Sequence, residues 1–585
     1  MSELFRSLRP LYNPIGFGAA DFIVLAWAGL LVLLLIAVVR CGPAAIARRT
    51  RWSMLVLALL PMALRLALLP TAPVPAPRAP DDFSYALLGD TLAHFRLANP
   101  PHPMHRFFET NFVLQEPTYS SIYPLGQGIA LAFGQIILRQ QWAGVVLCAG
   151  AFCGLCYWML RPWTTPAWAL IGGLLAVFEF GPLQYWMNTY WGGSLAAAGG
   201  CLIFGSLPRL HQRARSRDAA LLGLGIAVEW LTRPFETALI LLCVGLFLIP
   251  AFRGRWRLLA RIGSVAALAT LPAVALTLLQ NRQVTGHWTM LPYMLSQYQY
   301  GVPTSFTPQP VPTPHRPLTQ EQKTDYDLQS SVHGSSPGTF FAFLERLGKR
   351  VRFYRFFFPV PLLLALPVFF PALRQFRFLW VALSLAILGL GANFYPYFYP
   401  HYIAGGACLF VLVSVTALER LSRWSSETAR LILLLAAAQF IFWYGLHLLA
   451  GWEPARELTE EYESWDYVNH GDPEGRIAID RRLAQLGGKQ LVFVRYGPQH
   501  RLDQWVWNAA DIDRSAIVRA LDLGPVEDEK LRRYYPDRTA WLLEPDARPP
   551  RLERYRPERP QPLALPNNKS PFEDVPSAPG AGAPH

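Results

Sequence analysis

The chain has 585 residues, of which 52% are hydrophobic and only 16% are charged, and its formal net charge is +13. This composition excludes an ordinary soluble globular protein and a disordered one. The arginines cluster in short loops between apolar blocks of about 16 to 20 residues, as the positive-inside rule predicts. Membrane topology therefore accounts for the positive charge, and nucleic-acid binding is not indicated.

Twelve apolar blocks are predicted to span the membrane, with the basic loops on the cytoplasmic side and both termini outside. A further stretch at 123–138 is short and interrupted by glycines, so we expect it to form a helix on the outer membrane face. If it crossed, the basic loops that follow would lie outside. The predicted spans are 22–39, 52–70, 142–160, 167–184, 192–207, 219–233, 235–250, 262–280, 357–372, 378–394, 402–418 and 430–450.

The predicted fold is a polytopic α-helical membrane protein with extracytoplasmic juxtamembrane helices over residues 1–450. Its first outer loop covers 71–141, and its second large outer loop covers 281–356. The expected location is the inner membrane of a bacterium, with any active site on the extracytoplasmic side.

The character of the sequence changes after Leu449. Residues 451–545 alternate charged, helix-like pieces (EGRIAIDRRLAQLGG and AADIDRSAIVRALDLG) with strand-like runs (KQLVFVRYG and RTAWLLEPD). This pattern predicts a small extracytoplasmic α/β domain. Residues 546–585 are rich in Pro, Arg and Ala and are predicted to be a disordered tail.

The seven cysteines lie inside or at the edges of apolar segments, so disulfides in the long polar regions are excluded. Cys153 and Cys156 form a CxxC on a predicted spanning helix, where packing sulfur is more typical than a redox or zinc site. The first outer loop also holds His94, His102 and His105, but their spacing does not match a zinc signature. No metal ligands are predicted.

Adjacent acids at Asp81 and Asp82 follow the second predicted span on its outer side. The structural interpretation is a helix N-cap with an acid in the first turn, because the sequence Pro80-Asp81-Asp82 is typical of the start of a helix. The functional interpretation is a general base that deprotonates an acceptor hydroxyl. Repulsion between the two carboxylates would raise the pKa of one and leave its partner ionised.

A second constellation lies in the turn TRPFE, where Glu229 and Arg233 are four residues apart and Glu236 follows. One interpretation is a self-neutralising ion pair, because an unpaired charge in the membrane is costly. In the other interpretation, Arg233 binds the phosphate of a lipid-linked donor, because the planar guanidinium can donate two parallel hydrogen bonds to a phosphate. Arg65, in the second span, is a weaker candidate for the same role or for partnering an aspartate.

The order of a span, an acidic pair, a surface helix and Tyr123-Pro124 opening a second juxtamembrane helix resembles the GT-C glycosyltransferases. The similarity is to their protein mannosyltransferase and aminoarabinose transferase branch, over roughly residues 50–420. By this resemblance Asp81 matches the catalytic acid of the family's Asp-Glu pair, and Asp82 replaces the Glu. His401 and Tyr402 match a basic residue followed by Tyr at the start of a late helix.

The resemblance implies an enzyme that moves a sugar from a polyprenyl-phosphate donor to an extracytoplasmic hydroxyl on a glycan, lipid or protein. The donor's phosphate or sugar would be held by residues among Arg233, His102, Tyr123, His401, Tyr402 and Arg65. No nucleotide is needed, and a divalent metal ion remains open because some relatives use one.

Two other function classes fit a polytopic chain. A secondary transporter would carry protons on Glu229 and Glu179, although transporters usually show inverted repeats and broken helices at the midplane. A non-catalytic scaffold for envelope assembly with a GT-C-like fold is the third interpretation. Loss of solute uptake in Glu229 variants would indicate the transporter, and retained partner binding by inactive carboxylate variants would indicate the scaffold.

Overall fold

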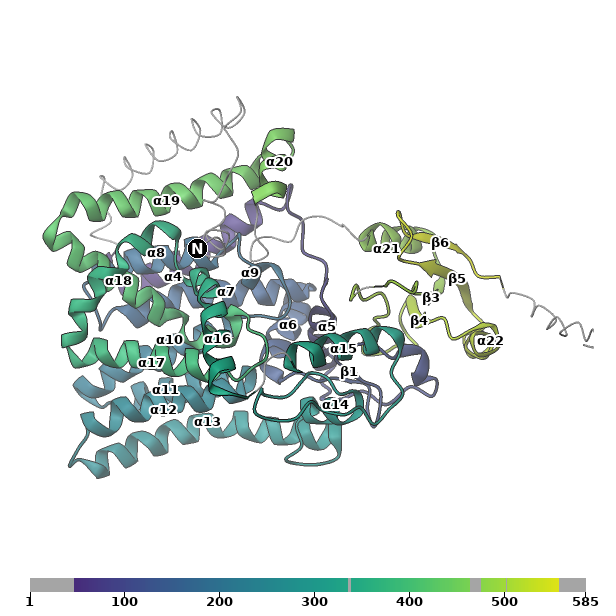
Figure 1. The fold of residues 1–585 in the computed structure, drawn as a ribbon, viewed down its shortest axis with the longest axis horizontal. Coiled ribbons are helices and arrows are strands. Elements are labelled where there is room, and N and C mark those ends of the chain that lie inside the picture. The colour runs from purple at the N-terminus through teal and green to yellow at the C-terminus, as the bar shows by residue number, and fades with distance from the viewer. Residues whose placement is uncertain (1–46, 335–337, 463–474, 501, 557–585) are drawn as a thin grey trace, which may run out of the picture.

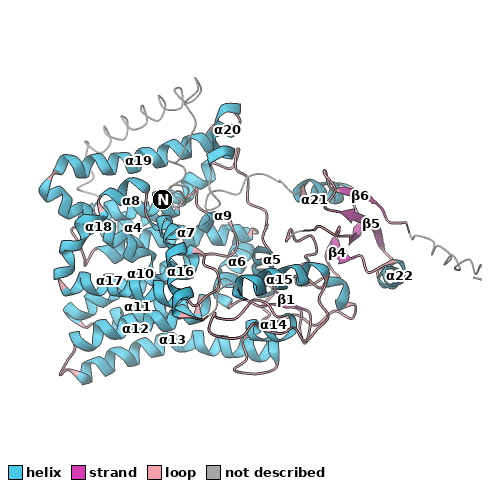
Figure 2. Ribbon diagram, viewed as in Figure 1, coloured by secondary structure: helices cyan, strands magenta, loops and turns pink. Residues whose placement is uncertain are grey.

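The computed structural model describes residues 47–334, 338–462, 475–500 and 502–556. Long helices pack side by side in one bundle, and a small sheet lies beyond one end of it (Figure 1). Figure 2 shows that the strands belong to this sheet and to a short hairpin near the same end of the bundle. The predicted span at 22–39 lies outside the described residues.

The bundle contains helices that match ten of the predicted spans, with small shifts at their ends. Six described helices are long and apolar enough to cross a membrane. Leu59, Leu242, Leu268 and Leu431 on these helices are at least half exposed, which suits a surface facing hydrocarbon. The total of twelve spans stays a prediction. The bundle helices are α4 (Thr50–Ala67), α7 (Gln141–Leu160), α8 (Pro166–Phe180), α10 (Ser194–Arg213), α11 (Ser216–Thr232), α12 (Pro234–Ala251), α13 (Trp256–Thr285), α17 (Phe376–Ala392), α18 (Ala407–Trp424) and α19 (Ser426–Leu448).

The prediction of a continuous spanning helix at 357–372 is wrong. This stretch lies across three short 3-10 helices, η2 (Val351–Phe357), η3 (Val360–Leu364) and η4 (Leu366–Arg374). Closely spaced prolines remove backbone donors and clash with the preceding turn, so no α-helix propagates here. The late span also begins with a 3-10 segment, η5 (Pro400–Gly406), before α18.

One end of the bundle, which the sequence predicts to be the outer one, is built from short helices and one hairpin. The helices predicted after Pro80 and after Tyr123 are both present, as α5 (Pro80–Ala93) and α6 (Leu125–Leu138). The remaining elements are η1 (His105–Phe108), β1 (Val113–Leu114), β2 (Ser120–Ser121), α9 (Tyr185–Asn188), α14 (Pro292–Tyr300), α15 (Gln320–Gly334), α16 (Phe340–Arg350) and α20 (Glu453–Tyr462).

The C-terminal sheet has the strand order β4-β3-β5-β6, in which the first three strands are parallel and β6 is antiparallel. Two sequence predictions are wrong here. The piece AADIDRSAIVRALDLG holds a buried edge strand, β4, rather than a helix, and β6 extends the sheet into the predicted tail. The elements are α21 (Arg476–Gln485), β3 (Lys489–Val494), β4 (Ile517–Leu521), α22 (Pro525–Tyr534), β5 (Arg538–Glu544) and β6 (Arg551–Arg554).

The sheet-bearing segment docks directly on α5. The Ala510 amide donates to Asp90 Oδ2 at 2.7 Å, and the Arg476 guanidinium donates to the Pro77 carbonyl at 3.0 Å. The rings of Phe83 and Trp507 lie 5.5 Å apart. The helix that carries Asp81 and Asp82 is therefore held between the bundle and the C-terminal segment.

Candidate functional site

Asp82 is fully engaged by the backbone. Its Oδ2 accepts from the amides of Arg78 at 3.1 Å and Ala79 at 3.2 Å, closing the first turn of α5. Its Oδ1 accepts from the Tyr190 amide at 2.7 Å. Burial raises the pKa of Asp82 to about 6, although these three donors oppose the rise. The structural interpretation made from the sequence, a helix-capping acid, describes Asp82.

Asp81 is presented differently on the same turn. Its side chain is partly exposed and accepts a hydrogen bond from the Tyr123 hydroxyl. Tyr123 is held in place by stacking on Tyr85, with ring centroids 4.2 Å apart. Burial raises the pKa of Asp81, and the Tyr123 hydrogen bond and the positive charge of Arg233 oppose that rise. Asp81 is the carboxylate of the pair that faces a hydroxyl and a cation rather than a helix cap.

Arg233 stands between the end of α11 and the start of α12, where Pro234 breaks the helix. Its guanidinium carbon lies 4.9 Å from the centre of the Tyr402 ring. Within the described ranges, the guanidinium makes no hydrogen bond and no salt bridge, so the ion pair with Glu229 considered from the sequence does not form. The Glu229 carboxylate instead lies against Gly199 and Gly405 and next to the backbone of Gly200.

Seven tyrosines surround Asp81 and Arg233, and we call them the tyrosine cluster. Each lies within electrostatic reach of one or both charges. They come from α5, from the start of α6, from α14 and from the turn before α18. The sequence analysis identified two of them, and the density of aromatic residues in FYPYFYPHY is the signal that marks three more. The members are Tyr85, Tyr123, Tyr293, Tyr395, Tyr397, Tyr399 and Tyr402.

Arg65 organises the turn at residues 188–193, whose sequence is NTYWGG. It is buried, and its Nε donates to Asn188 Oδ1 at 2.6 Å while its two terminal nitrogens donate to the carbonyls of Ala72 and Pro73. Gly193 in this turn has a φ of 133°, and a Cβ there would meet the Trp186 ring. Since its donors are occupied, Arg65 is placed as a structural residue.

The two candidate histidines are also engaged elsewhere. His102 Nε2 lies 3.1 Å from Asp513 Oδ1 and 3.1 Å from the Tyr535 hydroxyl, so it joins the first outer loop to the C-terminal segment. His401 is buried, with its Nδ1 3.0 Å from the Tyr185 hydroxyl. Neither ring contributes a hydrogen bond to Asp81 or Arg233 in the described residues.

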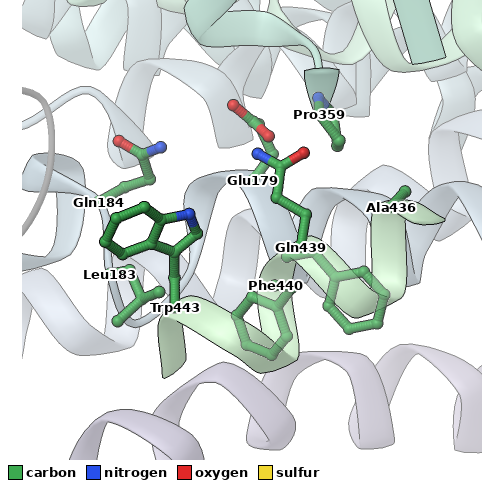
Figure 3. A pocket seen from close by; sticks show the side chains of 9 residues that line it. Glu179, Leu183, Gln184, Pro359, Ala436, Gln439, Phe440 and Trp443 are labelled. Atoms are coloured by element: carbon green, nitrogen blue, oxygen red, sulfur yellow. The ribbon is translucent and has the colours of Figure 1, made fainter. Parts of the chain in front are cut away.

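Glu179 lies in a separate cavity, shown in Figure 3 with Gln184, Gln439 and Trp443. The volume of the cavity is about 20 Å³, which is room for one water molecule. Glu229 is not among its lining residues. The two acids that a proton-coupled transporter would use are therefore not gathered around one solute-sized space.

Among the described residues, no group of three or more His, Cys, Asp or Glu side chains is arranged to hold a metal ion. The site consists instead of the partly exposed Asp81 carboxylate, the Arg233 guanidinium with the buried Glu236 within electrostatic reach, and a ring of phenols. This arrangement can accept a proton at Asp81 and bind an anion at Arg233.

No protein-family model and no curated protein sequence matches this chain. Among solved structures, the chain is similar to ArnT from Cupriavidus metallidurans bound to undecaprenyl phosphate, with a TM-score of 0.48 and 12% identity over 83% of this chain and 92% of that one. The oligosaccharyltransferase of Archaeoglobus fulgidus, in a complex with Zn and sulfate, matches with a TM-score of 0.43 and 11% identity over 84% of this chain and 67% of that one.

Proposed function

We propose that this chain is an integral membrane glycosyltransferase that moves a sugar from a polyprenyl-phosphate donor to an extracytoplasmic acceptor hydroxyl. The observation that carries the proposal is that Asp81 and Arg233, whose guanidinium makes no hydrogen bond or salt bridge within the described residues, lie within electrostatic reach of each other inside the tyrosine cluster, at the end of the bundle where the short helices gather. Such a transfer requires a base and an anion-binding group that lie close to each other.

The transfer follows from these two charges. Arg233 binds the phosphate that links the sugar to the lipid, and its fixed fork stabilises the negative charge that grows as this phosphate leaves. The Asp81 carboxylate accepts the proton of the acceptor hydroxyl. The acceptor oxygen then bonds to the anomeric carbon while the bond from that carbon to the phosphate oxygen breaks. The phosphate departs with the bonding electron pair, and attack from the opposite face inverts the anomeric centre.

The other tyrosines position the sugar. Aromatic rings offer apolar faces to a sugar ring, and their hydroxyls offer donors and acceptors to its hydroxyls. Tyr85 and Tyr123 flank the Asp81 side, while Tyr402 covers the guanidinium of Arg233. The donor therefore has its sugar between the carboxylate and the arginine, with the lipid leaving toward the bundle.

Arg233→Gln tests the phosphate assignment. We expect KM for the lipid-linked donor to rise and kcat/KM to fall by about 10²-fold, because a charge-assisted hydrogen bond worth roughly 1.5–3 kcal/mol is lost. Arg233→Lys should recover part of this loss, since it restores the charge without the fork. The measurement is the donor dependence of transfer in reconstituted membranes. A normal donor KM in both variants would remove Arg233 from the site.

Tyr123→Phe tests the identity of the base through pH. The Tyr123 hydroxyl stabilises the ionised form of Asp81, so its removal raises the pKa of Asp81 further. Because the base acts as a carboxylate, activity is lost as the pH falls through this pKa, and the acid limb of the kcat/KM profile should move to higher pH. Tyr157→Phe is the matched control, because that hydroxyl donates to the Ala47 carbonyl instead. An unchanged acid limb would contradict the role of Asp81.

A further inference from the structure

A cavity of about 290 Å³ lies between the turn before α8, the start of α17 and the last turns of α18. Its volume is close to the lower end of the range for small-molecule sites, roughly 300 Å³. The other ends of α17 and α18 lie beside the tyrosine cluster, because α17 ends just before Tyr395 and η5, which leads into α18, contains Tyr402. The cavity is therefore at the opposite end of the bundle, which the sequence predicts to be cytoplasmic.

The lining of this cavity is positively charged. It contains the side chains of Arg377, Arg420 and Arg423 and one acid, Glu419. Three guanidinium groups and one carboxylate leave two positive charges. Both oxygens of the acid are already engaged, since Glu419 Oε2 accepts from the Thr164 hydroxyl at 2.7 Å and its Oε1 accepts from Arg423 at 2.9 Å. The charges of Arg377 and Arg420 are the ones that remain uncompensated.

These two arginines have donors to spare. Arg420 is partly buried and makes no hydrogen bond or ion pair with the described residues. The Nε of Arg377 donates to Gln375 Oε1 at 3.1 Å, a neutral acceptor. The helices α8 and α17 both begin at this cavity, and neither N-cap residue, Thr165 or Gln375, caps its helix with its side chain. The free amides of both first turns add to the attraction for an anion.

Apolar side chains stand exposed next to the arginines. Phe376 and Leu379 on α17 and Trp424 at the end of α18 are at least half exposed. Exposed apolar groups at the end of a spanning helix suit contact with lipid, and tryptophan is typical of the membrane interface. The cavity thus lies where the headgroups of a bilayer meet its hydrocarbon. An occupant that carries both a phosphate and acyl chains matches both surfaces, whereas a free anion matches the arginines alone.

We propose that this cavity binds the phosphate headgroup of an anionic phospholipid, such as phosphatidylglycerol, from the leaflet at this end of the bundle. Arg377 and Arg420 hold the phosphate oxygens by charge-assisted hydrogen bonds, and the acyl chains lie along the exposed apolar side chains of α17 and α18. The 18 residues of α18 alone extend over roughly 27 Å. The cavity is therefore distinct from the donor site proposed at Arg233, and the lipid fastens the ends of three helices.

Native mass spectrometry of the purified full chain in detergent tests the site. The probes are phosphatidylglycerol and phosphatidylcholine with the same acyl chains, which share a phosphodiester and differ because choline neutralises its charge. We expect phosphatidylglycerol to bind the wild type about tenfold more tightly. Arg377→Gln and Arg420→Gln should each weaken it about fivefold and leave phosphatidylcholine unchanged. The control is Arg257→Gln, at an exposed arginine near the start of α13 that does not line the cavity.

Thermal unfolding in detergent separates a binding defect from a folding defect. Arg420 has no partner to lose among the described residues, so Arg420→Gln should unfold at the wild-type temperature without lipid. Phosphatidylglycerol should raise the midpoint of the wild type, because a ligand of the folded state stabilises it. The rise should be smaller in Arg420→Gln and unchanged in Arg257→Gln.

Three results would overturn the proposal. Equal affinity of the wild type for the two lipids would remove the recognition of charge. Equal weakening by Arg257→Gln and Arg420→Gln would show a general attraction to this end of the bundle rather than a site. Displacement of phosphatidylglycerol by millimolar inorganic phosphate, dependent on Arg420, would make the occupant a soluble phosphate. Asp81→Asn should keep the lipid affinity, so this result is independent of sugar transfer.

Discussion

Replacement of Asp81 with asparagine is expected to lower the rate of sugar transfer by about 10²- to 10⁴-fold, the contribution of a positioned general base. The amide keeps the shape of the side chain and still accepts a hydrogen bond from Tyr123, but it cannot take a proton from the acceptor. Binding of the lipid-linked donor at Arg233 should change little. The measurement is the single-turnover conversion of the donor in membranes that hold equal amounts of wild-type and variant protein.

The stability of the Asp81→Asn protein is the control for this result. Because Asp81 is partly exposed and does not cap α5, the variant should unfold at nearly the same temperature as the wild type. Transfer at more than a tenth of the wild-type rate would show that another group accepts the proton. The assignment of Asp81 as the general base would then be wrong.

Replacement of Asp82 with asparagine is expected to lower the stability of the protein, whereas Asp81→Asn lowers the rate of transfer at unchanged stability. Three backbone donors converge on this carboxylate, from Arg78, Ala79 and Tyr190. An asparagine offers one acceptor oxygen and turns an NH₂ group toward the remaining donors, and each orphaned buried donor costs about 1–3 kcal/mol. We expect the midpoint of thermal unfolding in detergent, followed by tryptophan fluorescence, to fall by roughly several degrees.

The matched comparison is Arg65→Gln, because Arg65 and Asp82 hold the same turn of residues 188–193 from two sides. Both variants should lower the unfolding midpoint and reduce transfer in proportion to the amount of folded protein. A fully stable Asp82→Asn protein with no activity would instead make Asp82 the reacting carboxylate, and the roles of the two acids would be exchanged.

The sequence predicted most of the long helices because a spanning helix can be recognised from its length and apolar composition alone. The failures have local causes. Prolines divide 357–372 into 3-10 turns, although the mean hydropathy of the stretch resembles that of a span. The charged residues before Ile517–Leu521 predict a helix, whereas this segment pairs in parallel with the distant strand β3 and its Val518 and Ala520 are buried, which no local pattern reveals.

The candidate site was predicted in part. The sequence located Asp81, Tyr123, Arg233 and Tyr402, and the structure brings these four side chains together. The sequence analysis also named His102 and Arg65 as candidates for binding the donor. In the structure, their side chains join segments that are far apart in the chain. A polar side chain can be satisfied by a group that is distant in the sequence. Such pairings depend on tertiary contacts, and the spacing of residues along the chain does not reveal them.

The central claim, transfer from a polyprenyl phosphate by Asp81, is tested most directly by mass spectrometry of lipid extracts. Native cells would carry the wild-type, Asp81→Asn or Glu345→Gln protein at matched levels, where Glu345→Gln is the control at an exposed acid. The account predicts that a glycosyl polyprenyl phosphate accumulates in the Asp81→Asn cells alone, because the donor is made but not consumed. Identical lipid profiles in all three strains would contradict it.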